Sequence, residues 1–103
     1  MAVIKITADN FEEEVINSKI PVLVDFWATW CGPCQMQGPV VEEAAEEFFG
    51  NVKVGKLNVD EEGALAQKYG VMSIPTLILF KDGQVAQKAV GFHSIEEIRT
   101  ILA

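Results

Sequence analysis

The segment Ile20–Trp27 (IPVLVDFW) is a nearly continuous apolar run, interrupted by one charged residue, Asp25. A half-exposed strand alternates apolar and polar residues, whereas an unbroken apolar run is typical of a strand that is buried on both faces. Such a strand needs helices on both sides of its sheet. The chain has 103 residues, of which 50% are hydrophobic, so a single domain at residues 1–103 can enclose this strand in a core.

The segments around this run alternate between strand and helix patterns. We expect strands at residues 3–6, 20–27, 52–59, 76–80 and 85–90, and helices at residues 11–16, 34–49, 61–69 and 95–102. Local signals support several of these boundaries: Gly50 should stop the second helix, Asp60 should cap the third, and Ser94 with Glu97 forms a capping box for the fourth. Asp82-Gly83 predicts a hairpin turn. This order predicts an α/β domain with parallel strands and an antiparallel final hairpin.

Both cysteines of the chain stand two residues apart in WCGPC, directly after the apolar strand. Structural zinc usually takes four Cys or His ligands, and this chain has two cysteines and one histidine. Covalent haem attachment needs a histidine after the second cysteine, where Gln35 stands. A structural crosslink over so short a loop would contribute only about 2 kcal/mol. The spacing therefore favours dithiol redox chemistry, with a metal site or an accidental spacing as the open alternatives.

The position of the cysteine pair supports this interpretation. Cys31 is expected where a buried strand passes into a long helix, close to the unpaired N–H groups of the first helical turn. These donors and the helix dipole favour the thiolate of Cys31. Gly32 and Pro33 fit this turn, since proline is suited to the first positions of a helix.

Asp25 and Lys56 are charged residues within predicted strands. Burial should raise the pKa of Asp25, and a carboxyl group that holds its proton near a dithiol is suited to acid–base work. A structural aspartate that accepts a backbone hydrogen bond is the alternative. For Lys56 the simplest interpretation is a side chain that extends to solvent.

The sequence resembles the thioredoxin family along nearly its whole length. The resemblance rests on WCGPC after VDFW and on further motifs: Pro39, KLNVD at 56–60, YGVMSIPT at 69–76, LILFKDG at 77–83 and Val90-Gly91. The Gly-Pro dipeptide between the cysteines is similar to that of thioredoxins, not to the Pro-Tyr of many glutaredoxins or the Pro-His and Gly-His of secreted oxidases and isomerases. The resemblance implies a thioredoxin fold, a five-stranded mixed sheet flanked by four helices.

The resemblance also implies a function, the reduction of protein disulfides through a reversible Cys31–Cys34 dithiol. Cys31 would be the exposed nucleophile, and Cys34, which is more buried, would resolve the mixed disulfide. Asp25 would assist proton transfer during the attack by Cys34, with Lys56 nearby as its charge partner.

A substrate-docking surface follows from the same resemblance. Pro75 would form a cis bond with Ile74 and face the disulfide, leaving the backbone of Ile74 free to pair with an extended substrate segment. The flat apolar docking surface would consist of Trp30, Gly32, Pro33, Ile74, Pro75, Gly91 and Phe92.

Partners and compartment are further expectations. A thioredoxin reductase would recharge the dithiol, which itself carries the electrons, so we expect no bound cofactor, no metal and a monomer. The formal charge of −7 argues against nucleic acid or an anionic membrane as partner. The N-terminus lacks the pattern of a secretory signal, which favours the cytoplasm.

Two other functions stay open, an oxidase or isomerase of a secretory compartment and a non-catalytic binding subunit. The chain also departs from the family pattern. Gln35 stands where many thioredoxins carry Lys or Arg, and Gln37-Gly38 is more polar than the usual approach to the helix proline. Neither departure touches the dithiol, so we expect them to affect the choice of partner.

Overall fold

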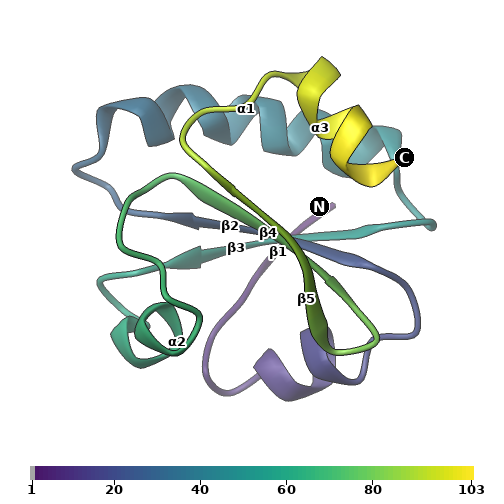
Figure 1. Ribbon diagram of the computed structural model, residues 1–103, viewed down its shortest axis with the longest axis horizontal. Helices are drawn as coiled ribbons and strands as arrows, with labels where there is room; N and C mark the ends of the chain where they lie inside the picture. Colours follow the sequence, from purple (N-terminus) through teal and green to yellow (C-terminus); the bar gives the residue numbers. More distant parts are fainter. Residues whose placement is uncertain (1) are drawn as a thin grey trace.

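The computed structural model describes residues 2–103 as a five-stranded sheet with helices on both faces (Figure 1). The strands are β1 (Val3–Lys5), β2 (Val22–Trp27), β3 (Lys53–Asn58), β4 (Thr76–Lys81) and β5 (Gln84–Val90). The helices within these residues are η1 (Glu12–Ile16), which is a short π-helix, α1 (Gly32–Glu47), α2 (Gly63–Lys68) and α3 (Ile95–Leu102). The α/β class and the mixed sheet flanked by four helices are thus confirmed for this part of the chain.

The strand β2 lies in the middle of the sheet, whose order is β1-β3-β2-β4-β5. It pairs in parallel with β3 and antiparallel with β4, so both of its edges are hydrogen-bonded. Helices cover both faces, and residues 22–26 are all buried. This double burial is the reason why the sequence of β2 lacks the alternation of a half-exposed strand.

Two apolar layers lie on opposite faces of the sheet. On one face, Val22, Val24 and Phe26 pack in a cluster that includes Val15 of η1 and Ala66 of α2. On the other face, the cluster joins Leu23 of β2 to apolar residues of α1 and α3, which lie together above the sheet in Figure 1. Because side chains alternate along a strand, Asp25 points to the same face as Leu23, which is the face that α1 covers.

The predicted hairpin turn and capping box are confirmed, whereas the predicted cap of α2 is not. Asp82 and Gly83 both have positive φ, as the predicted hairpin turn between β4 and β5 requires, and the capping box of Ser94 and Glu97 is present at α3. The predicted cap of α2 is wrong: the helix begins at Gly63, after Glu62, and no side chain caps it. Asp60 instead binds Trp30.

The long helix differs from the prediction at both ends. α1 begins at Gly32, ahead of the predicted start at residue 34, which places Cys31 at the helix boundary as its position after the buried strand predicts. The helix ends at Glu47, three residues before Gly50. Gly50 has a φ of 91°, so it serves the turn after the helix. No helix within residues 2–103 combines the length and the apolar character needed to cross a bilayer.

Candidate functional site

The two cysteines lie at the start of α1, just beyond the carboxyl end of the central strand. Cys31 is the N-cap residue of the helix, and its backbone is extended, with φ −90° and ψ 115°. Its sulfur accepts a hydrogen bond from the backbone N–H of Cys34, with an N–Sγ distance of 3.2 Å. Cys31 and Cys34 are joined as a disulfide. When the disulfide is reduced, this N–H donor and the helix dipole favour a thiolate on Cys31.

The expected exposure of Cys31 is wrong for this disulfide form. Cys31 is 5% exposed and Cys34 is 4% exposed, so accessibility does not distinguish the two residues. Cys31 is buried because Trp27, Val59 and Ile74 pack around the cysteines, and the Cys31 sulfur lies 3.7 Å from the carbonyl oxygen of Ile74. The asymmetry between the sulfurs therefore lies in their polar neighbours.

Asp25 is a buried carboxyl group behind the dithiol. It is 3% exposed, and among residues 2–103 its Oδ1 atom has no hydrogen-bond partner. Burial raises the pKa of Asp25 from its ordinary value of 3.8 to about 7, while the positive charge of Lys56 lowers it. The carboxyl group is thus able to gain or release a proton near neutral pH.

A polar pocket of about 200 Å³ connects this carboxyl group with one cysteine only. The pocket, here called the Asp25 pocket, is lined by Asp25, Trp27, Cys34, Gln35, Gly38, Glu42 and Lys56. Cys31 is not part of its wall. The Asp25 carboxyl group therefore shares this pocket with Cys34, and the pocket is large enough to hold water.

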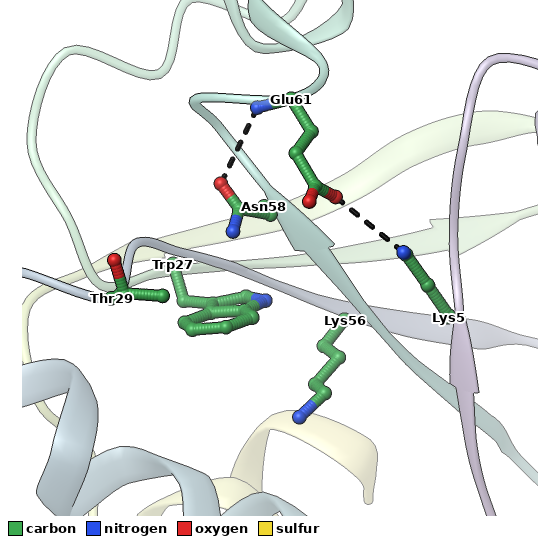
Figure 2. Close-up of a pocket in the computed structure, with 6 residues that line it drawn as sticks. All are labelled: Lys5, Trp27, Thr29, Lys56, Asn58 and Glu61. Atoms are coloured by element: carbon green, nitrogen blue, oxygen red, sulfur yellow. Dashed lines mark hydrogen bonds and ion pairs between the residues drawn. The ribbon is translucent and has the colours of Figure 1, made fainter.

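Lys56 lies opposite Asp25 in the parallel register of β2 and β3, so both side chains belong to the same face of the sheet. Within residues 2–103 no ion pair joins them; the Lys56 ammonium group instead lies 5.0 Å from the centroid of the Trp27 ring. Figure 2 shows Lys56 beside Trp27 in a second pocket of about 290 Å³, while Lys5 turns toward Glu61. Lys56 thus acts on the pKa of Asp25 through space.

The residues expected at the docking surface differ in their exposure. Trp30 is 70% exposed, and Gly32, Pro33 and Phe92 are also exposed. Ile74 and Gly91 are half-buried, whereas Pro75 is buried, so its side chain does not belong to an exposed surface. The bond between Ile74 and Pro75 is cis, as the resemblance implies.

The backbone at Pro75 is hydrogen-bonded to another loop, whereas in the described part of the chain the backbone at Ile74 is free to pair with a peptide. The carbonyl of Pro75 accepts a hydrogen bond from the N–H of Gly91 at 2.8 Å, which ties two parts of the expected docking surface together. Within residues 2–103, neither backbone group of Ile74 has a backbone hydrogen-bond partner. An extended peptide could therefore pair with Ile74 beside the disulfide.

Asp60, predicted from the sequence as a helix cap, instead contacts a residue next to Cys31. Its carboxylate accepts a hydrogen bond from Nε1 of Trp30 at 2.8 Å, which holds the indole beside Cys31. The two residues are thirty positions apart, and no local pattern links them. Met72, two positions before Ile74, is a further exposed apolar residue that the sequence-based prediction did not include.

Comparisons with known proteins agree with this geometry. A sequence model of the thioredoxin family matches residues 2–103. The thioredoxin of Staphylococcus haemolyticus is 52% identical over 102 residues, which are 99% of this chain and 96% of that protein. Thioredoxin 1 of Synechococcus elongatus is 55% identical over 86 residues (84% and 80%), and the thioredoxin of Pyropia yezoensis is 50% identical over 91 residues (88% and 85%). With its dithiol at the start of α1, the chain belongs to the thioredoxin family and is a thiol–disulfide oxidoreductase that reduces protein disulfides.

Proposed function

We propose that the two sulfurs act in a fixed order. The Cys31 thiolate attacks one sulfur of the target disulfide, so a Cys31–target bond forms while the target's other sulfur leaves as a thiolate and takes up a proton. Cys34 then loses its proton and attacks the Cys31 sulfur; the Cys31–Cys34 bond forms, and the second target thiol leaves. Two electrons thus pass from the dithiol to the target. The hydrogen bond from the Cys34 N–H to the Cys31 sulfur is the observation that carries this assignment.

In this proposal Asp25 handles the proton of Cys34. The carboxylate accepts that proton through the Asp25 pocket when Cys34 attacks, while the departing target thiolate takes up a proton from water. Lys56 favours the ionised form of Asp25, because its positive charge lowers the pKa of that carboxyl group. A pKa of about 7 lets the group exchange this proton at neutral pH.

The proposed docking surface surrounds the disulfide. Trp30, Gly32, Pro33, Gly91 and Phe92 would contact the target, and the backbone of Ile74 would pair with an extended target segment beside the buried Pro75. We propose that a thioredoxin reductase recharges the protein at the same surface. The chain would act as a monomer of one domain, residues 1–103, in the cytoplasm, without nucleic acid or membrane partners.

Replacing both cysteines by serine tests the activity directly. With the Cys31→Ser/Cys34→Ser variant, the rate of insulin reduction by dithiothreitol should fall to the uncatalysed rate, because no sulfur is left to form the mixed disulfide. Turbidity of the released insulin chains measures the rate, and circular dichroism checks the fold. Catalysis by the double variant at the wild-type rate would show that the dithiol does not carry the reaction.

Asp25→Asn should slow the release of the target from Cys31 by at least about tenfold at pH 7, because Cys34 loses its proton acceptor. Stopped-flow tryptophan fluorescence in a single turnover separates formation of the mixed disulfide from its resolution. Asp82→Asn is the matched control, since it removes the same charge from an exposed turn. Equal resolution rates in wild type and Asp25→Asn would reduce Asp25 to a structural residue.

A further inference from the structure

Gln37 is a polar residue that lies fully inside the protein. It is on α1, one turn after Cys34, and is 0% exposed. Its amide makes two hydrogen bonds with the backbone of a single residue: Nε2 donates to the carbonyl oxygen of His93 at 3.0 Å, and Oε1 accepts from the N–H of His93 at 2.8 Å. A buried side-chain amide that is satisfied in this paired manner fixes the distance and orientation between the two segments.

The segment held by Gln37 contains part of the proposed docking surface. Residues 91–93 lie in the connection between β5 and α3, and they include Gly91 and Phe92. The segment has two further hydrogen bonds at its start: the Gly91 N–H donates to the Pro75 carbonyl at 2.8 Å, and Nδ1 of His93 lies 2.8 Å from the Gly91 carbonyl oxygen. Gly91 is thus tied to the Pro75 loop, and His93 is tied to the helix that carries the dithiol.

We propose that Gln37 is a positioning residue for target docking. It holds residues 91–93 at a fixed place relative to Cys31 and Cys34, so that Phe92 and the Pro75 loop meet an incoming protein in one arrangement. The inference rests on the proposed docking surface. Because Gln37 belongs to neither the disulfide nor the Asp25 pocket, it should affect the binding of large targets and leave the reactivity of the sulfurs unchanged.

The physical reason is the cost of unpaired backbone groups. Gln37→Met keeps a side chain of similar length and volume but removes both hydrogen bonds, which leaves the N–H and the carbonyl of His93 without these partners. The free energy of these unpaired groups then falls if residues 91–93 move toward water, which can hydrogen-bond to them. Gln87→Met is the matched control, because Nε2 of Gln87 also donates to a backbone carbonyl, that of Ile101 at 3.2 Å, but it does so on the exposed strand β5.

The experiment compares a large and a small target. Reduced wild type, Gln37→Met and Gln87→Met are mixed with insulin or with hydroxyethyl disulfide, and stopped-flow fluorescence gives each second-order rate constant. We expect Gln37→Met to react about five- to tenfold more slowly with insulin and within twofold of wild type with hydroxyethyl disulfide, as the loss of about 1–1.4 kcal/mol implies. Amide exchange at His93, measured by NMR, should become at least about fivefold faster. Gln87→Met should change none of these values.

The outcomes separate this inference from the proposed function. The positioning role alone is overturned if wild type reacts with insulin and Gln37→Met reacts with it equally well. It is also overturned if Gln37→Met loses the rate with insulin and the rate with hydroxyethyl disulfide to the same extent. Unchanged amide exchange at His93 in Gln37→Met overturns it as well. Wild type that reacts with neither disulfide contradicts the proposed function, and with it the docking role that depends on it.

Discussion

Cys34→Ser should turn the protein into a trap for its targets. Cys31 keeps its place at the N-terminus of α1, where the backbone N–H groups and the helix dipole favour its thiolate, so the first attack proceeds. The internal thiol that would release the target is missing, and the mixed disulfide accumulates. Incubation with an oxidised target protein should give adducts that migrate as larger species on a non-reducing gel and collapse when reductant is added.

Cys31→Ser is the matched control for this trap. Its remaining thiol, Cys34, lies in the first turn of the helix rather than at the N-cap, and it faces the Asp25 pocket. We expect at least about tenfold less adduct than with Cys34→Ser at equal concentration. Both cysteines are buried to the same degree in the disulfide form, so we attribute the expected difference in adduct to their polar surroundings. Equal trapping by the two variants would contradict the assigned order.

Features that depend on neighbouring residues were predictable from the sequence. The hairpin at Asp82-Gly83 follows from two residues that tolerate positive φ, and the capping box at Ser94 follows from side chains three positions apart. The burial of β2 follows from its apolar run, and the raised pKa of Asp25 follows from that burial. In each case the sequence signal lies within one segment.

Features that depend on contacts between distant segments were not predictable in this way. The carboxylate of Asp60 has the chemistry of a helix cap, but the indole N–H of Trp30 competes for it. Glutamine in a helix is usually exposed to solvent, yet the amide of Gln37 makes its hydrogen bonds inside the protein, with a residue 56 positions away. The burial of Cys31 likewise depends on Val59 and Ile74, which approach only when the sheet has formed.

The buried carboxyl group of Asp25 links stability to pH. Burial raises its pKa from 3.8 to about 7, so between about pH 4 and 7 the folded chain holds a proton that the unfolded chain has released. The folded state binds more protons, and the free energy of unfolding therefore falls as the pH rises through this window. A pKa difference of this size corresponds to on the order of 4 kcal/mol, and the loss is complete above about pH 7.

Asp25→Asn should remove this pH-dependent loss, because the amide has no charge to bury. At pH 8 the oxidised variant should be more stable than oxidised wild type by about 2–4 kcal/mol, and the difference should shrink toward zero at pH 4, where Asp25 is protonated in wild type. Urea unfolding at pH 4, 6 and 8 measures the difference. Asp82→Asn removes the same charge from an exposed turn whose positive φ asparagine tolerates, and it should show no such trend. If the difference in the free energy of unfolding between Asp25→Asn and wild type is independent of pH, then burial does not raise the pKa of Asp25.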